Sequence, residues 1–132
     1  MLVHLDTDFL VHALSRRGLE WERLVALARS DAQIQMSAIA WYEFGRGPRT
    51  PEQMAVARSF FFEDGIVPFS EALSERAAAV FRLLGSPRRH GADIAIGVTA
   101  CVLGARLLTR NGRHFGRIPE LEFEVVCDDS GS

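Results

Sequence analysis

Asp93 is the residue in this sequence that most needs a chemical explanation, because it opens a stretch, residues 91–100, that is otherwise apolar or small. Such a stretch is typical of a buried helix, and a carboxylate at the N-terminal end of such a helix costs free energy unless something compensates the charge. The dipole and the free N–H groups of the helix N-terminus supply part of that compensation. A cation shared with other carboxylates would supply the rest, so other acids are expected to converge on Asp93.

Asp6 is the first acid that could do so, since it lies where a short apolar strand, residues 2–5, leads into a helix over residues 9–14. Thr7 or Asp8 is expected to cap that helix, because each side chain can accept a hydrogen bond from a free N–H group. In an open parallel sheet, ligands bind at the carboxyl ends of the strands. Asp6 therefore lies at the kind of edge where a ligand site is expected.

Glu43 is the second candidate, in a helix expected over residues 38–44 that follows a strand over residues 33–36. A lone glutamate usually faces solvent, but the neighbours of Glu43 are bulky and aromatic and leave little room for a fully solvated face. A third polar group, Thr109-Arg110-Asn111, ends another expected strand over residues 106–109. All these groups fall at strand ends or near helix starts, so we expect them to lie close in space although they are far apart in the chain.

The remaining elements also alternate between helices and strands, with clear boundary signals. Thr50, Pro51 and Gln53 form a capping box with proline at the first helical position. The other predicted elements are helices over residues 19–29, 51–62 and 71–84 and strands over residues 66–69 and 123–126. This alternation predicts a three-layer α/β/α domain with a mostly parallel central sheet. We expect one domain over residues 1–132, with a frayed tail from about residue 128.

The composition narrows the classes of function. The chain has 132 residues, 48% hydrophobic and 24% charged, with a net charge of −2, which is typical of an ordinary globular domain and gives no global basic field. All fifteen basic residues are arginine. The lack of lysine excludes Schiff-base chemistry and the P-loop phosphate cradle. Arginine suits phosphate binding through its planar fork, although a codon bias towards arginine explains the composition equally well.

The sequence favours a cytoplasmic protein. Its first residues lack the basic flank and the long apolar core of a signal peptide, and no apolar run reaches the length of a membrane span. Cys101 and Cys127 are far apart with no CxxC spacing, so reduced, buried or half-buried thiols are expected.

Four motifs in order make the sequence similar to a known family. They are Leu5-Asp6-Thr7-Asp8-Phe9-Leu10, Ser37-Ala38-Ile39-Ala40-Trp41-Tyr42-Glu43, Asp93-Ile94-Ala95-Ile96-Gly97-Val98-Thr99-Ala100 and Leu108-Thr109-Arg110-Asn111-Gly112-Arg113-His114-Phe115. Their order and spacing resemble a PIN domain, most closely the VapC-type toxins of bacterial toxin–antitoxin pairs. The resemblance covers essentially the whole chain.

The resemblance implies a Mg²⁺- or Mn²⁺-dependent endoribonuclease in which Asp6, Glu43 and Asp93 hold the metal. Relatives often have asparagine or serine where this chain has Asp8. The fourth acid of the family often falls where Asn111 or His114 stands here, and we favour Asn111 as the fourth catalytic residue. The resemblance further implies a cognate antitoxin, a homodimer and an RNA substrate, for which transfer RNA is common in the family.

The implied chemistry is consistent with the residues. Carboxylates about 5 Å apart repel one another by roughly 3 kcal/mol per pair at an effective dielectric constant of about 20. A hard divalent cation relieves that repulsion, and Mg²⁺ keeps waters that can be activated for in-line attack on a phosphodiester. No nucleophilic side chain is needed, which agrees with the lack of a persuasive Ser-His-Asp or Cys-His arrangement in the sequence.

Simpler explanations exist for each residue. Asp6 could be only a helix cap, Glu43 a surface residue and Asp93 a partner of the helix dipole. Thr7 and Thr109 could cap or contact metal-bound water, and Asp8 is expected to cap. Arg110 and His114 could contact phosphate, as could the other loop arginines, Arg88, Arg89 and Arg113, or they could be ordinary exposed side chains.

Two other functions fit part of the pattern. The Asp6-Thr7-Asp8 sequence after an apolar strand also suits a haloacid-dehalogenase-like phosphatase with Asp6 as the nucleophile, but that mechanism usually needs a lysine and leaves Glu43 unexplained. The second alternative is a catalytically weak PIN-like module that only binds RNA or a partner. The aromatic run over residues 60–62 is one candidate partner surface, and burial in the core is the other interpretation.

Overall fold

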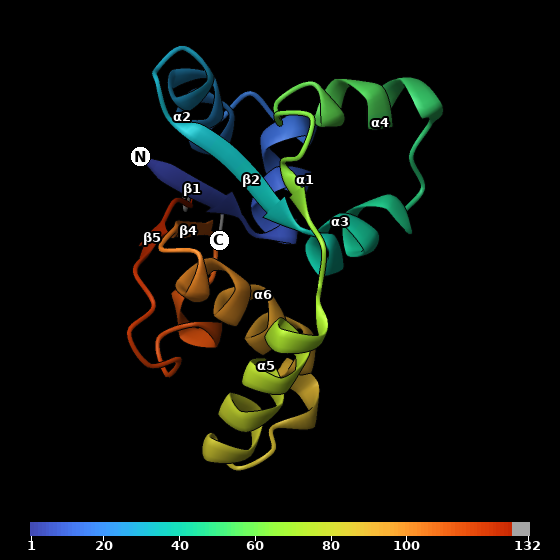
Figure 1. Cartoon of the computed structure of the whole chain (residues 1–132). Coiled ribbons are helices and arrows are strands. Elements are labelled where there is room, and N and C mark those ends of the chain that lie inside the picture. Colours follow the sequence, from blue (N-terminus) through green and yellow to red (C-terminus); the bar gives the residue numbers. More distant parts are fainter. Residues whose placement is uncertain (128–132) are drawn as a thin grey trace.

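All five strands of the computed structural model belong to one parallel sheet in the order β3-β2-β1-β4-β5 (Figure 1). The strands are β1 (Leu2–Leu5), β2 (Gln33–Ser37), β3 (Ile66–Val67), β4 (Arg106–Thr109) and β5 (Phe123–Val125). The structure describes residues 1–127, so the tail that was expected to fray from about residue 128 lies outside the described residues.

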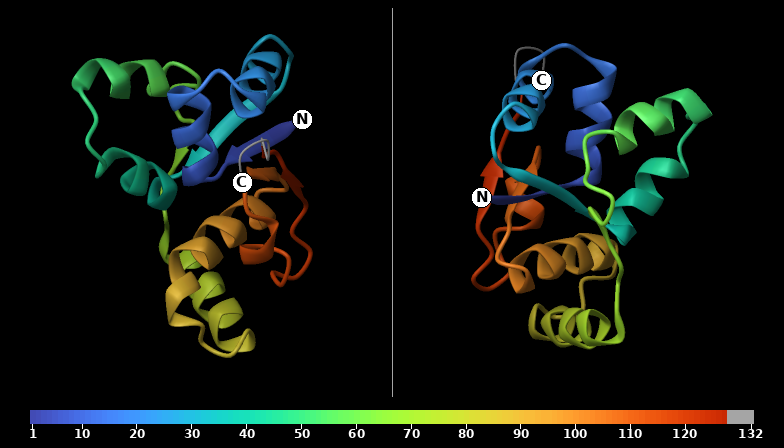
Figure 2. Two further views of the ribbon diagram at one scale, coloured as in Figure 1. Left: turned by 180° about the vertical axis from the view of Figure 1, so that it is seen from behind. Right: turned by 45° about the horizontal axis from the view of Figure 1, so that its top comes forward.

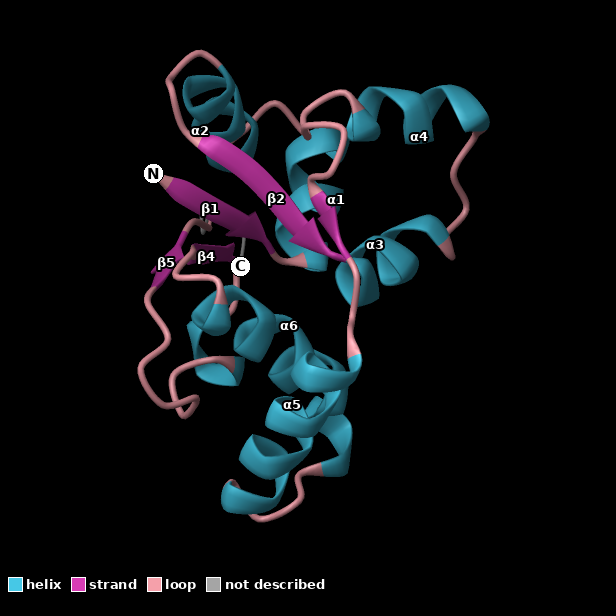
Figure 3. Cartoon of the chain, viewed as in Figure 1, coloured by secondary structure: helices cyan, strands magenta, loops and turns pink. Residues whose placement is uncertain are grey.

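Helices cover both faces of this sheet, which confirms the predicted three-layer α/β/α architecture. The helices are α1 (Thr7–Ser15), α2 (Leu19–Ala28), α3 (Ala38–Gly45), α4 (Pro51–Arg58), α5 (Glu71–Leu83) and α6 (Gly91–Val102), with short 3-10 helices at Arg88–His90 and Gly112–His114. In Figures 1 and 2, α1, α2 and α4 lie on one side of the sheet and α5 and α6 on the other. Figure 3 shows how α3 leaves the carboxyl end of β2, where it packs against both α1 and α6.

The strand register brings distant polar residues together at one edge. Leu5 at the end of β1 pairs with Leu108 near the end of β4, and the Asp6 N–H donates to the Leu108 carbonyl at 2.9 Å. Asp6 and Thr109 therefore both emerge at the carboxyl edge of the two central strands, as the parallel topology predicted.

The core confirms that the Asp93 helix is buried. In α6 every residue from Ile94 to Ala100 is buried, and β1 and β4 lie beneath with most of their side chains inaccessible to solvent. No helix within residues 1–127 is long and apolar enough to cross a membrane. Cys101 and Cys127 are both half-buried, as expected.

Two helix boundaries differ from the sequence prediction. Helix α1 begins at Thr7 and its cap is Asp6, so the expected cap at Thr7 or Asp8 is wrong. Helix α4 ends at Arg58 instead of about residue 62, because the Arg58 guanidinium donates to the carbonyls of Phe61 and Phe62 in the turn that follows. Of the two phenylalanines, Phe61 is buried in the core, while Phe62 is 54% exposed and remains a candidate partner contact.

Gly97 lets α6 approach the chain segment that follows the second 3-10 helix. A Cβ atom at Gly97 would clash with Ile118 Cδ1 and would lie 3.3 Å from side-chain atoms of Leu121 and Phe115. We expect Gly97→Val to lower the free energy of unfolding by about 1–3 kcal/mol, the usual cost of overpacking a core. Denaturant unfolding checks this, with Gly91→Ala as the control in the same helix, since a Cβ there meets no atom within 4 Å. Equal stability of the two variants would contradict the packing argument.

Candidate active site

The carboxyl edge of the sheet carries an acidic cavity of about 310 Å³ that gathers residues from four separate segments. Its lining residues are Asp6, Thr7, Asp8, Val11, Glu43, Arg46, Asp93, Asn111 and His114. The structure thus brings Asp6, Glu43 and Asp93, which are far apart in the sequence, to one surface. Thr109 and Arg110, which were also predicted site residues, do not line the cavity.

Asp6 is held rigidly at the base of this cavity. It is only 6% exposed, its Oδ1 accepts from the Thr7 N–H at 2.8 Å, and its Oδ2 accepts from the Thr109 hydroxyl at 2.9 Å. Burial raises the pKa of Asp6 to about 6; the Thr109 hydrogen bond opposes this rise and the negative charge of Asp93 adds to it. An ionised carboxylate in this buried position is unfavourable without a positive charge nearby. A bound cation would supply that charge.

Glu43 is joined to the Asp6 segment through Thr7. The Thr7 hydroxyl contacts Glu43 Oε1 at 2.9 Å and the Ala40 carbonyl at 3.3 Å, so it ties the start of α1 to α3. Arg46, one helical turn after Glu43, lies 3.8 Å from Glu43 Oε2. The glutamate therefore faces the cavity and is not a solvated surface residue.

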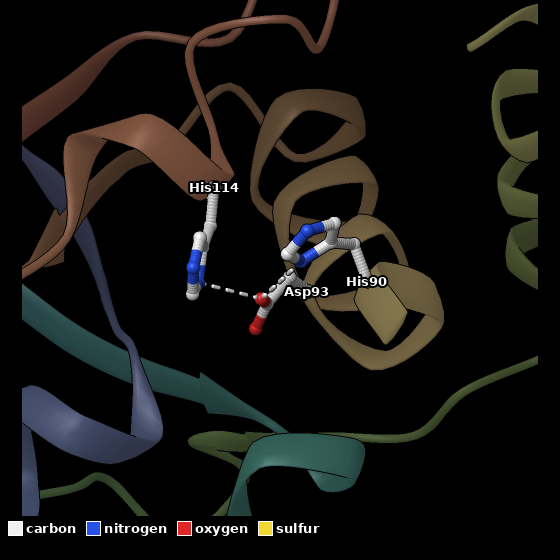
Figure 4. Close-up of side chains that lie close together, drawn as sticks. All are labelled: His90, Asp93 and His114. Atoms are coloured by element: carbon white, nitrogen blue, oxygen red, sulfur yellow. Dashed lines mark ion pairs between the residues drawn. The ribbon is translucent and has the colours of Figure 1, made fainter. Parts of the chain in front are cut away.

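Asp93 enters the cavity from the first turn of α6 and is flanked by two histidines. His114 Nδ1 lies 3.0 Å from Asp93 Oδ2, and His90 Nδ1 lies 3.7 Å from the same oxygen (Figure 4). Figure 4 shows the two imidazole rings on either side of the carboxylate, one from the 3-10 turn before α6 and one from the turn after β4. Asp93 is thus more than a partner of the helix dipole.

Asn111 and Thr109 organise the β4 side of the site. The backbone N–H of Asn111 donates to the Thr109 hydroxyl oxygen at 3.0 Å, and Asn111 Nδ2 lies 3.1 Å from His114 Nε2. Thr109 therefore donates a hydrogen bond to Asp6 without lining the cavity, whereas Asn111 lines the cavity and contacts His114. The geometry favours neither Asn111 nor His114 alone for the fourth position of the site, because the two side chains are hydrogen-bonded to each other.

Asp8 is an exposed carboxylate of the cavity lining, and Arg110 contacts it from outside the lining. Arg110 donates to Glu20 Oε2 at 2.8 Å and to Asp8 Oδ2 at 3.2 Å, and Asp8 also contacts His12. Asp8 is thus an exposed residue of the first turn of α1, and the guanidinium of Arg110 is engaged by two carboxylates. An RNA phosphate would have to compete with those carboxylates for Arg110.

Sequence reasoning missed two residues of the site, Arg46 and His90. Each lies three positions from a predicted acid, Arg46 after Glu43 and His90 before Asp93. On a helical turn that spacing brings side chains to the same side, so the signal was present in the sequence.

The donor set fits a hard divalent cation, because Asp6, Glu43 and Asp93 line one cavity together with the more exposed Asp8, and the buried Asp6 has a raised pKa. Within residues 1–127, however, the one group of three His, Cys, Asp or Glu side chains whose ligand atoms all lie within 4.8 Å of one another is His90, Asp93 and His114. A cation shared by Asp6, Glu43 and Asp93 would therefore bind some of them through water, which Mg²⁺ commonly does.

Thr109 offers a test of how Asp6 is positioned. We expect Thr109→Val to raise the pKa of Asp6 further and to weaken divalent-cation binding about 5- to 150-fold, because the loss of a buried hydrogen bond to a charged group costs about 1–3 kcal/mol. Calorimetric titration with Mn²⁺ measures this. The matched control is Thr99→Val, since the Thr99 hydroxyl is equally buried but donates to the Ala95 carbonyl of its own helix. If both variants bound the cation equally well, Thr109 would have no role in the site.

Comparison with known proteins agrees with this architecture. A family model described as the PIN domain matches residues 3–121. A search among curated proteins found no significant sequence match. Similar solved structures include VapBC2 from Rickettsia felis bound to a DNA fragment from their promoter, with a TM-score of 0.74 and 22% identity over 95% of this chain and 98% of that chain. A toxin–antitoxin complex from Klebsiella pneumoniae has a TM-score of 0.70 and 27% identity over 90% of this chain and 94% of that chain.

A third similar structure, VapBC-1 from nontypeable Haemophilus influenzae, has a TM-score of 0.69 and 21% identity over 95% of this chain and 98% of that chain. The family match covers the β1 and β4 edges, α3 and α6, and so it includes every residue that lines the acidic cavity. The predicted resemblance to VapC-type PIN domains is confirmed at the level of the family and the fold. The chain belongs to the PIN domain family.

Proposed function

We propose that this chain acts, as a single domain, as the toxin of a toxin–antitoxin pair and cleaves RNA as a Mg²⁺- or Mn²⁺-dependent endoribonuclease. The observation that carries the proposal is the convergence of Asp6, Glu43 and Asp93 in one cavity at the carboxyl edge of the sheet. Family membership supports the nuclease class, and the similar toxin–antitoxin structures support the biological role.

The residues of the cavity have different roles in the proposed reaction. A divalent cation, when bound, supplies a more acidic water and neutralises charge that builds up on the phosphoryl oxygens. Asp6, fixed by Thr7 and Thr109, and Glu43, fixed by Thr7, present oxygen ligands in set directions. Asp93 presents a third carboxylate from the opposite side, and Asn111 lies where its amide can orient a water or a phosphate.

The proposed partners are an antitoxin, an RNA such as a transfer RNA, and a second copy of the chain in a homodimer. A groove of about 460 Å³ with a mixed apolar and polar lining, next to the acidic cavity, is a candidate seat for an antitoxin segment. It is lined by residues of α1 to α4 and the turn before α4, among them Leu14, Trp21, Phe44 and Val56, with Arg17 and Arg49 also in the lining. Because Val11 lines both the groove and the acidic cavity, an antitoxin segment in the groove could continue into the cavity.

One observation favours a second candidate function, a PIN-like module that binds RNA or a partner without cutting. Asn111 and His114 stand where the family often has its fourth acid, so the site carries less negative charge to hold a cation. The haloacid-dehalogenase alternative has no such support, because both Asp6 oxygens are occupied by hydrogen bonds and the cavity also contains Glu43 and Asp93.

Purified protein and structured RNA decide between the two. The nuclease proposal predicts cleavage that needs Mg²⁺ or Mn²⁺ and stops when a chelator is added. It also predicts that expression of the chain alone arrests growth and that Asp6→Ala relieves the arrest. If the wild-type chain and the Asp6→Ala variant bound RNA equally well and neither cut it in either metal, the binding module would be the correct function.

A further inference from the structure

The two histidines beside Asp93 are not needed for a site built from carboxylates. His90 comes from the 3-10 turn Arg88–His90, His114 from the turn Gly112–His114, and their rings lie 4.7 Å apart between centroids (Figure 4). His90 Nδ1 is buried but has no hydrogen-bond partner among residues 1–127, because its distance of 3.7 Å from Asp93 Oδ2 is too long for a hydrogen bond. A buried ring nitrogen that makes no hydrogen bond although a carboxylate oxygen lies 3.7 Å away needs an explanation.

We propose that His90, Asp93 and His114 form a second metal site that selects borderline transition metals, Zn²⁺ or Co²⁺, over Mg²⁺. Imidazole nitrogen is a preferred ligand of Zn²⁺, whereas Mg²⁺ prefers oxygen. Two histidines and one carboxylate are a common protein ligand set for a zinc ion that keeps an open position.

The spacing of the donor atoms fits such an ion. Two ligands of a tetrahedral zinc ion, each about 2.0–2.2 Å from the metal, lie roughly 3.4 Å apart. The distances from Asp93 Oδ2 to the two Nδ1 atoms, 3.0 and 3.7 Å, lie on either side of that value. One ligand atom from each of the three residues falls within 4.8 Å of the other two, so small side-chain rotations complete the geometry.

Asn111 supplies the outer contact that orients a metal-binding histidine. Its side-chain amide meets His114 Nε2 at 3.1 Å, while His114 Nδ1 faces Asp93. When Nδ1 binds a metal, the ring proton must be on Nε2, and the amide oxygen of Asn111 can accept it after a turn of the amide. Such partners fix the tautomer and the ring orientation of metal-binding histidines.

The shared Asp93 makes the two sites compete. A zinc ion that binds Asp93 Oδ2 together with both imidazoles takes one of the three carboxylates from the Mg²⁺ site. Zn²⁺ is therefore expected to inhibit Mg²⁺-dependent cleavage, a consequence that rests on the proposed function, whereas the metal site itself does not.

The test is direct binding of Co²⁺ to the metal-free chain, followed by its visible absorption spectrum and by calorimetry. The wild-type chain is expected to bind one Co²⁺ in this site with the intense visible bands of a four-coordinate ion. His90→Ala and His114→Ala should each weaken binding at least about 100-fold, since loss of a direct ligand exceeds the 10- to 100-fold effect of an outer partner. Circular dichroism shows whether each variant is folded.

Two further variants make the result specific. His12→Ala removes a histidine of α1 outside the cluster and should leave the Co²⁺ affinity unchanged. Asp6→Asn should keep the Co²⁺ bands, because Asp6 belongs only to the carboxylate site. The proposal is overturned if the wild-type chain shows no such bands, or if Asp6→Asn loses them while His90→Ala keeps them. Failure of RNA cleavage would leave these binding results unaffected, so the two proposals fail separately.

Discussion

Asp93→Asn is expected to reduce the single-turnover rate of RNA cleavage on the order of 10³-fold, the size of effect seen when one preorganised electrostatic contact at a reacting centre is lost. The amide has the same shape as the carboxylate but lacks its charge, so the cavity loses a ligand oxygen while α6 keeps its packing. The two flanking histidines lose their anionic partner as well. The rate is measured at saturating Mg²⁺ on a structured RNA, and unfolding curves verify that the variant is folded.

The matched control is Asp64→Asn, which removes the same charge from an exposed turn between α4 and β3. This control should cleave RNA at the wild-type rate and, on expression, should still arrest growth. Cleavage by the Asp93→Asn variant within a few-fold of the control would show that Asp93 has no part in the reaction.

The second large effect is a gain in stability when Asp6 is neutralised. Between pH 3.8 and about 6 the folded chain binds more protons at Asp6 than the unfolded chain does, because burial raises the pKa of the folded state from 3.8 to about 6. The stability of the metal-free protein therefore falls as the pH rises through this window. Above about pH 6 the charged Asp6 lowers the free energy of unfolding by about 3 kcal/mol, since a pKa difference of one corresponds to about 1.4 kcal/mol.

Asp6→Asn removes that cost and is expected to stabilise the metal-free chain by up to about 3 kcal/mol at pH 7.5. Part of the gain is lost because the Thr109 hydroxyl must turn to accept from the new amide. Denaturant unfolding in a chelator measures the difference, which should nearly vanish at pH 3.5, where Asp6 is mostly protonated in both states. The same variant should not cleave RNA. A variant that is less stable than wild type at both pH values would contradict the electrostatic account of Asp6.

The sequence predicted the site to the extent that the site follows from topology. Asp6 and Thr109 could be placed together because parallel neighbouring strands end at one edge, and Asp93 because an acid at the mouth of an apolar helix needs a counter-charge. Glu43 depended on the bulky neighbours that keep it from solvent and on the resemblance to PIN domains. These inferences rest on the local sequence pattern and on the geometry of a parallel sheet, and both can be worked out from the sequence alone.

Other features depend on contacts that no local pattern specifies. The ion pair of Arg110 with Glu20 joins residues 90 positions apart, and it engages a guanidinium that was predicted as a possible phosphate contact. His90 acquires its position from a 3-10 turn that sequence reasoning treated as a loop. The early end of α4 follows from hydrogen bonds of Arg58 to the next turn, and the cap of α1 shifts to Asp6 because its carboxylate accepts from the Thr7 N–H.

Anomalous diffraction from crystals grown with Mn²⁺ shows whether Asp6, Glu43 and Asp93 hold one divalent cation. We expect an anomalous peak in the acidic cavity, bonded to at least one of the three carboxylates and linked to the others directly or through water. In crystals of the Asp6→Asn variant the peak should weaken or vanish. A wild-type structure with Mn²⁺ only between His90 and His114, or with no ion in the cavity, would contradict the carboxylate site.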